Sequence, residues 1–428
     1  MTADAPEPGP GSGRPAAHPA SFLPGPVPDR TTWEGWNRWR LTRRDFVPAP
    51  VISAEDHARM TPRQQRLHDL HRIATHSNLL IQETPMSAYV SWKVRALIED
   101  NAFNHGPDTR PGVMINGGGC QGKTETICEV IASFEDEWLA LYAQNPCAVA
   151  GTLDLHAPVA YVRTPVKATP ISTCQRILDF YGEGYKGMRQ EDLIRTVKNA
   201  IYDHGTKALV LDDITRLKLH READQDVLDL IRELMSLPLT LILAGVGIPR
   251  SGLLRDGRKD PRTGQWLFPP VKDRGKSRND DAPGQTDLRF DLLDLDRFTY
   301  DTPAGIAAWT AHLVGIEQQL RLLHGHDGML SDGAMPEYLF RRTGGIVGLV
   351  KKLVQAGCRY AMETGHEQIT AELLDMLALS PADLPDLDSD AGEVPDIPAA
   401  PTAPSRKPRK PRNTVFDDRG TPAAGTAS

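Results

Sequence analysis

A glycine-rich run that ends in lysine and threonine carries the clearest chemistry in this sequence. Residues 117–124 read Gly-Gly-Gly-Cys-Gln-Gly-Lys-Thr, which fits the Walker A pattern G-x-x-x-x-G-K-[ST] at every fixed position. An apolar run at 112–116 precedes it, and a helical pattern at 123–142 follows it. Glycines let backbone N–H groups close around phosphates, and the helix N-terminus adds partial positive charge. The run therefore predicts a P-loop that binds a nucleotide.

Two side chains of this loop have predicted roles, with ATP and Mg²⁺ as the cofactors. Lys123 should reach the β- and γ-phosphates, and the Thr124 hydroxyl should ligate Mg²⁺. We interpret Cys120 as a small tolerated side chain, with a redox switch as the alternative. The predicted nucleotide-binding residues are Gly117, Gly118, Gly119, Cys120, Gln121, Gly122, Lys123, Thr124 and Glu125.

A second apolar run ends in two acidic residues and predicts the rest of a catalytic site. Leu209, Val210 and Leu211 precede Asp212 and Asp213, one strand–helix unit after the P-loop. Asp212 should hold Mg²⁺, through water, and Asp213 should orient or activate the attacking water. Many P-loop ATPases have glutamate at the second position. The shorter aspartate predicts an ATPase that is slow or needs a partner.

Two later features could complete such a site. Arg289, after the fourth predicted strand, is placed to reach the γ-phosphate held by a neighbouring subunit, with Arg297 as the competing candidate. An ordinary surface or salt-bridge arginine is the alternative. Residues 343–348, Thr-Gly-Gly-Ile-Val-Gly, open a helix whose N-terminus could approach the nucleotide. The alternative is a tight turn before a packed helix.

Aromatic residues and histidines elsewhere suggest less. Trp33, Trp36 and Trp39 alternate with arginines, a pattern that could stack on bases or clasp a partner. We favour packing of this N-terminal arm on the body of the protein. The 13 histidines are scattered, and we interpret each as a surface or core residue rather than a metal ligand.

The elements that position these residues alternate along the chain. Strands are predicted at 112–116, 159–163, 208–211 and 239–244, with helices at 123–142, 169–181, 190–204 and 222–235. This order predicts a parallel sheet with helices on both faces. After the insertion at about 255–284 the pattern is helical only, which predicts a small lid domain, placed at 301–378.

Composition shifts divide the chain into five parts. Residues 1–30 contain eight of the 35 prolines, and residues 379–428 are equally poor in large apolar side chains, so both ends are predicted to be disordered. The C-terminal end is acidic and then basic, either a solvated tail or a tether for DNA or a protein. Between them we expect an arm and helix at 31–80, the nucleotide-binding domain at 81–300 with an insertion at about 255–284, and the lid at 301–378.

Charge, hydropathy and cysteine content exclude several classes of protein. The net charge of −7 excludes a uniformly basic nucleic-acid binder. No apolar run approaches the roughly 20 residues of a membrane span, and no signal-peptide core is present at the N-terminus. Five cysteines without CxxC spacing fit a reducing compartment, so we expect a cytoplasmic protein with no membrane association.

Taken together, these motifs resemble those of AAA+ ATPases, and in detail those of the TniB/TnsC group of transposition ATPases. The resemblance covers about residues 60–378 and includes Tyr161–Pro165, Leu209–Asp213, Leu241–Gly245, the lid run 343–348, and the later runs Ala361–Gly365 and Ile369-Thr370. It implies a regulator that assembles with ATP as a ring or filament on non-specific target DNA. Such a regulator recruits or activates a DDE-type transposase and disassembles on hydrolysis.

The resemblance also assigns residues by motif position. Arg289 would be the arginine finger that acts in trans, and Arg163 and Lys167, after the second strand, would contact DNA. The sequence departs from the AAA+ pattern at two sensor positions. Residues 244–247, Ala-Gly-Val-Gly, hold no polar side chain, and Gly348 stands where an arginine is common, with Lys351 and Lys352 one turn later.

Two other functions are compatible with the same ATP site. One is a P-loop signalling switch that binds a protein partner and not DNA, which the acidic net charge permits. The other is a helicase-loader-like AAA+ ATPase, because the Asp-Asp strand end also occurs in that group.

Overall fold

The computed structural model describes the region that contains every predicted catalytic residue. It describes residues 22–378 except 24, 81, 107, 145–155, 166–167, 215–224, 251–257, 261, 264–265 and 268–288. The predicted tail at 379–428 and residues 1–21 lie outside the described residues. So does most of the predicted insertion, of which a short antiparallel pair is described, β5 (Arg258–Lys259) and β6 (Trp266–Leu267).

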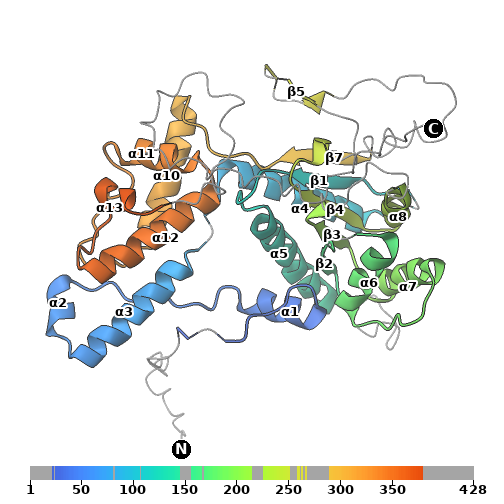
Figure 1. The fold of residues 1–428 in the computed structure, drawn as a ribbon. Coiled ribbons are helices and arrows are strands. Elements are labelled where there is room, and N and C mark those ends of the chain that lie inside the picture. The colour runs from blue at the N-terminus through green and yellow to red at the C-terminus, as the bar shows by residue number, and fades with distance from the viewer. Residues whose placement is uncertain are drawn as a thin grey trace, which may run out of the picture. The chain divides into compact units, whose positions relative to one another are not determined.

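Five parallel strands form the sheet that carries the P-loop (Figure 1). Their spatial order is β2-β3-β4-β1-β7. They span Gly112–Asn116 (β1), Val159–Arg163 (β2), Ala208–Asp212 (β3), Thr240–Gly245 (β4) and Phe290–Asp294 (β7). Because all strands are parallel, the carboxyl ends of β1, β2 and β3 meet at one edge. This edge is where the P-loop and the two aspartates lie.

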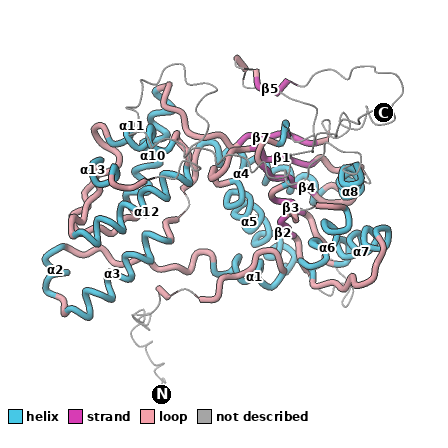
Figure 2. The backbone as a smooth tube through the Cα atoms, viewed as in Figure 1, coloured by secondary structure: helices cyan, strands magenta, loops and turns pink. Residues whose placement is uncertain are grey.

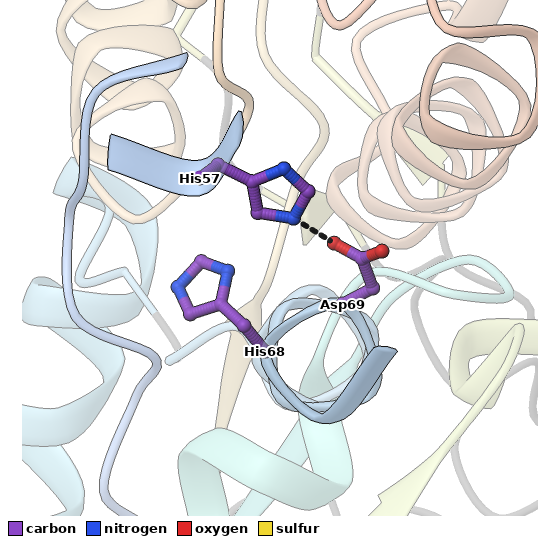
Figure 3. A group of neighbouring side chains, drawn as sticks. All are labelled: His57, His68 and Asp69. Atoms are coloured by element: carbon purple, nitrogen blue, oxygen red, sulfur yellow. Dashed lines mark hydrogen bonds and ion pairs between the residues drawn. The ribbon is translucent and has the colours of Figure 1, made fainter. Parts of the chain in front are cut away.

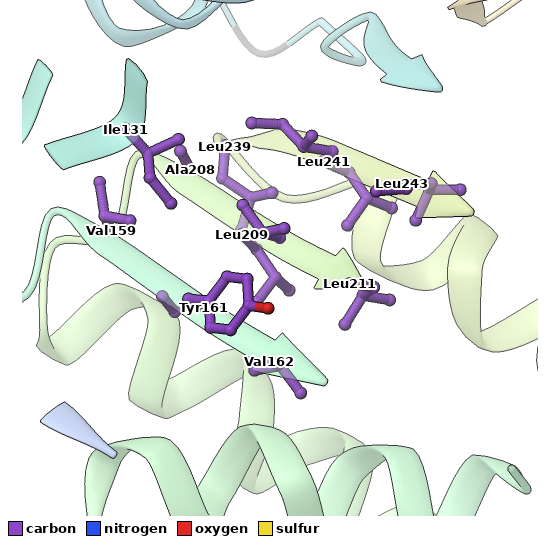
Figure 4. Packing of buried hydrophobic residues seen from close by; sticks show 14 of the residues in the cluster. Ile131, Val159, Tyr161, Val162, Ala208, Leu209, Leu211, Leu239, Leu241 and Leu243 are labelled. Atoms are coloured by element: carbon purple, nitrogen blue, oxygen red, sulfur yellow. The ribbon is translucent and has the colours of Figure 1, made fainter. Parts of the chain in front are cut away.

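Helices cover the sheet, so the three central strands β3, β4 and β1 are mostly apolar and buried, as expected for strands covered on both faces. They are α4 (Pro85–Phe103), α5 (Lys123–Gln144), α6 (Pro170–Tyr181), α7 (Gln190–Asp203) and α8 (Gln225–Met235). Helices α4 and α5 pack on each other, and α6 packs on β2 and α7. Figure 4 shows leucine and valine side chains of β2, β3 and β4 packed with Ile131 of α5. The predicted α/β fold is confirmed.

The N-terminal arm packs against α5, which confirms the favoured interpretation of its tryptophans. Helix α1 (Trp33–Thr42) places Trp36 at 0% exposure, with its indole Nε1 donating to Glu135 Oε2 at 2.5 Å. Arg40 lies 3.4 Å from the same carboxylate. Burial raises the pKa of the Glu135 carboxyl to about 7, although the Trp36 hydrogen bond and the Arg40 charge oppose this.

After α1 the chain runs without regular structure to α2 (Ala54–Arg59) and α3 (Pro62–Ser77) (Figure 2). Thr61 caps the N-terminus of α3 and forms a capping box with Gln64. Arg72 of α3 is almost fully buried and forms an ion pair with Glu367, Nη1 to Oε2 2.7 Å. A buried guanidinium needs such a partner, so this pair joins α3 to the C-terminal helices.

Four C-terminal helices surround a second apolar core. They are α10 (Pro303–Glu317), α11 (Met335–Thr343), α12 (Val347–Thr364) and α13 (Ala371–Asp375). Trp309, Leu313, Val350 and Val354 lie at its centre with almost no exposed surface. This all-helical region follows the sheet, as predicted. Among the described residues, no helix has both the length and the apolar surface that crossing a bilayer requires.

The arm gives a test of the packing. Trp36→Ala should lower the free energy of unfolding by about 3–5 kcal/mol, because it empties a fully buried indole site and leaves Glu135 with one donor fewer. Trp92→Ala, at a side chain that is 62% exposed, should change it by less than about 0.5 kcal/mol. Urea denaturation followed by circular dichroism measures both. Equal effects of the two variants would contradict the packed arm.

Candidate nucleotide-binding site

The P-loop turns from β1 into α5 through two residues in the left-handed backbone region. Cys120 has φ 58° and Gly122 has φ 84°, a conformation that glycine adopts without steric cost. Lys123 Nζ donates to the carbonyls of Gly117 at 3.0 Å and Gly118 at 2.6 Å. Burial lowers the pKa of Lys123, while the charges of Asp212 and Asp213 oppose that shift. The loop thus holds a half-buried amine over its own backbone.

Asp212 joins three parts of the site. Its side chain is buried, and Oδ2 accepts hydrogen bonds at 2.7 Å from both the Thr124 hydroxyl and the Tyr161 hydroxyl. Its Oδ1 accepts from the Asp213 backbone N at 2.8 Å. Thr124 is the second residue of α5, Tyr161 lies on β2, and Asp212 ends β3. The structure therefore brings together the two predicted Mg²⁺ ligands.

The residue after Asp212 has an unusual backbone. Asp213 has φ 57°, and outside glycine this region is populated mainly by asparagine and aspartate. This gives a physical reason why aspartate, rather than the longer glutamate, stands here. The Asp213 carboxylate lies 4.0 Å from Arg163 Nε, with both side chains about half exposed.

The donor set fits Mg²⁺ and a phosphate chain. A hydroxyl and a carboxylate in contact are hard oxygen ligands of the kind Mg²⁺ prefers. Lys123 and the N-terminus of α5 supply positive charge beside them. Thr124 and Asp212 could hold the metal, and residues 117–123 could hold the phosphates.

The first turn of α12 contacts the P-loop. Gly348 N donates to the Cys120 carbonyl at 2.9 Å. A Cβ atom at Gly348 would lie 2.6 Å from that oxygen and 2.8 Å from the Cys120 Cβ. Only glycine allows this approach, so the run 343–348 does bring a helix N-terminus to the loop.

A groove lies beside the start of α5. It has a volume of about 810 Å³ and is lined by residues of the arm, the α3–α4 connection, α5 and α12. Glu125 and Thr126, directly after the P-loop, form one wall, and Lys351 of α12 forms another. Lys351 Nζ donates to the Leu79 carbonyl at 2.9 Å. The volume is within the range of small-molecule sites, so the groove could receive the nucleoside.

The other predicted site residues lie apart from this cluster. Arg289 is exposed and precedes β7, whose first residue pairs with Gly112 and whose last pairs with Asn116. It therefore lies at the opposite edge of the sheet, about 13 Å or more along β7 from the P-loop edge. It cannot serve this chain's own P-loop, so any finger role must be in trans. Arg297 is also exposed but follows β7.

Arg163 is exposed at the end of β2, opposite Asp212 in register. Its proximity to Asp213 places it at the same edge of the sheet as the P-loop. Lys167, the second predicted DNA contact, lies outside the described residues.

Two residues at the site were missed by the sequence reasoning. Tyr161 binds Asp212, and Arg30 of the arm pairs with Glu125, Nη2 to Oε1 3.1 Å. The Arg30 guanidinium also lies over the rings of Trp39, at 5.1 Å from the centroid, and Tyr161, at 5.8 Å. A polar side chain in an otherwise apolar strand was the available signal for Tyr161. For Arg30, predicted to be part of a disordered tail, no local signal exists.

Residues 113–248 match the sequence model of the family described as AAA domain. The chain contains an AAA domain. The match begins at the second residue of β1 and includes the P-loop, β3 and β4. No curated protein matches the chain in sequence.

Solved structures resemble this AAA-domain chain at low identity. One is ORC1 of Aeropyrum pernix in complex with DNA, at 14% identity and a TM-score of 0.47, covering 71% of this chain and 68% of that one. Another is Drosophila ORC bound to DNA, at 11% and 0.40, covering 80% and 72%. A third is AMPPCP-bound DnaA of Aquifex aeolicus, at 14% and 0.35, covering 68% and 66%.

Tyr161→Phe tests whether the hydroxyl positions Asp212. The ring stays in place, but Asp212 Oδ2 loses one of its two donors. The Mg²⁺ concentration needed for half-maximal nucleotide binding should rise about 10-fold or more, as for other partners of metal ligands. Tyr185→Phe is the control, because that hydroxyl donates to Asp179 away from the site. An unchanged Mg²⁺ dependence in Tyr161→Phe would refute the positioning role.

Gly348→Ala tests the contact between α12 and the P-loop. The added methyl group cannot fit against the Cys120 carbonyl, so α12 must move away and nucleotide affinity should fall about 10-fold. Gly184→Ala, where a Cβ meets nothing within 4 Å, is the matched control. Fluorescent nucleotide titration measures both variants. If Gly348→Ala binds as tightly as the control, the contact has no role in binding.

Proposed function

We propose that this chain is an ATPase that regulates DNA transposition by assembling on duplex DNA in its ATP-bound form. The hydrogen bond from Thr124 to Asp212 is the observation that carries the ATPase proposal, because it joins the P-loop threonine to the strand that ends in two aspartates. The transposition role rests on the TniB/TnsC resemblance of the motifs and of the lid run.

The residues have distinct roles in this proposal. Lys123 and the loop backbone bind the phosphates, and Thr124 and Asp212 hold Mg²⁺, which offsets phosphate charge. Asp213 orients the attacking water. Aspartate at this position and the apolar end of β4 predict slow hydrolysis that a partner accelerates. Arg289 of one subunit would complete the site of the next.

A nucleotide could control assembly through α12. The Gly348–Cys120 hydrogen bond links the first turn of α12 to the loop that receives the phosphates. A ligand that binds differently when this contact is made or broken shifts the balance between those states. We propose that the ATP-bound state favours a ring or filament around duplex DNA of any sequence. Arg163 and Lys167 would face the DNA phosphates. The transposase would bind this assembly.

Lys123→Ala tests the link between ATP and DNA. It should abolish the ATP-dependent part of duplex binding, because it removes the cation beside the phosphates. Lys186→Ala, an exposed lysine between α6 and α7, controls for loss of one positive charge. Fluorescence anisotropy with a duplex of mixed sequence, with and without a non-hydrolysable ATP analogue, measures both. Undiminished ATP-dependent affinity in Lys123→Ala would rule out this mechanism.

Electron microscopy with the same duplex separates the proposal from its alternatives. Rings or filaments that need both nucleotide and DNA would support it, and the affinity should fall steeply with salt. Discrete particles with no DNA binding at low salt would favour the protein-binding switch. The helicase-loader-like alternative shares the ATP site and is favoured if the assembly binds a replicative helicase and no transposase.

A further inference from the structure

Two histidines and an aspartate converge between α2 and α3, far along the chain from the P-loop. His57 lies on α2, and His68 and Asp69 lie on α3 (Figure 3). One ligand atom from each lies within 4.8 Å of the other two. His57 Nε2 is 3.0 Å from Asp69 Oδ1. Two imidazoles and a carboxylate form the kind of ligand set found in zinc sites.

His68 is oriented as a metal ligand would be. Its Nε2 lies 3.3 Å from the Pro50 carbonyl, an acceptor that selects the tautomer with the proton on Nε2. That tautomer leaves a lone pair on Nδ1. The residue is 9% exposed, and among the described residues Nδ1 has no hydrogen-bond partner. In Figure 3 this nitrogen faces His57 and Asp69.

We propose that His57, His68 and Asp69 bind a zinc ion through His57 Nε2, His68 Nδ1 and the Asp69 carboxylate. Imidazole ligands favour zinc over Mg²⁺ or Ca²⁺, so this site is distinct in chemistry from the predicted Mg²⁺ site. Three protein ligands leave a fourth position for water. His57 and Asp69 are both partly exposed, which gives the ion a route from solvent.

Binding requires a modest closure. In a tetrahedral zinc site, ligand atoms lie about 3.3 Å apart, so no gap between the three ligand atoms must shrink by more than about 1.5 Å. A cavity of about 190 Å³ adjoins His68, which leaves room for its ring to adjust. Arg72 donates to Asp69 Oδ1 at 2.6 Å. The ion would therefore bind Oδ2 of Asp69, or it would bind Oδ1 and replace the contact between His57 and Asp69, with which it competes.

The ion would stabilise the position of α2, which few other contacts hold in place. Helix α2 has no buried residue, whereas α3 is joined to the C-terminal helices through Arg72 and Glu367. A bond from His57 to a shared zinc would fix α2 to α3 and so to that helical core. This role does not depend on the proposed function of the ATP site.

The experiment is a titration of the full chain, stripped with EDTA and dialysed, with Zn²⁺ and separately with Mg²⁺. We expect one Zn²⁺ per chain by competition with a chromophoric chelator, and a higher melting temperature with Zn²⁺ only. His68→Gln should weaken binding at least 10-fold. His71→Gln, on the same helix but outside the cluster, should not. A Cys120→Ser background removes, as a competing ligand, the one exposed thiol in the part of the chain that the structure describes.

Co²⁺ gives a readout that a structural defect alone would not produce. Co²⁺ bound in place of Zn²⁺ should give the visible absorption of a tetrahedral nitrogen–oxygen site in the wild type and in the His71→Gln variant. It should not give this absorption in the His57→Gln variant. If the His68→Gln variant fails to fold, the His57→Gln variant is used for the test, because His57 lies on the short helix α2. Equal zinc affinity in the wild type and both cluster variants, or no stoichiometric binding, would overturn the site.

Discussion

The buried carboxylate of Asp212 is the point through which the P-loop, β2 and β3 are joined. A carboxylate removed from water is stabilised only where donors surround it. Here a threonine hydroxyl, a tyrosine hydroxyl and a backbone N–H supply them. Each donor comes from a different place in the chain, so the acid fixes the distance between loop and strand before any ligand binds. A change of charge close to Asp212 would therefore alter these three hydrogen bonds.

The P-loop and the strands β1 to β4 could be predicted from the sequence because their signals are local. The fifth strand, β7, was wrongly included in the helical region, because Asp291 and Asp294 interrupt the apolar pattern of this half-exposed strand at the end of the sheet. Buried parallel strands are short apolar runs, and the predicted limits 112–116 and 159–163 agree with β1 and β2. Helix starts at Thr61, Thr84 and Thr169 follow from capping chemistry within four residues.

Contacts between distant residues could not be predicted in this way. Arg30 and Glu125 are 95 residues apart, and Tyr161 and Asp212 are 51 apart. Their pairing depends on strand order and on the path of the arm, neither of which leaves a local pattern. The His57 and His68 pair was likewise hidden, because an 11-residue spacing becomes a shared site only once α2 folds back on α3. The role of Arg289 in a neighbour's site stays a prediction, and the direction of β7 places this residue at the edge of the sheet away from its own P-loop.

The arm has a consequence for any shortened version of this protein. Arg30 pairs with Glu125 and covers the ring of Tyr161, the residue that holds Asp212. A chain trimmed to begin at the first helix would keep every motif residue and still lose the guanidinium that covers the ring of Tyr161 beside Asp212. The boundary of the folded unit around this site therefore lies upstream of residue 113, where the match to the AAA domain begins.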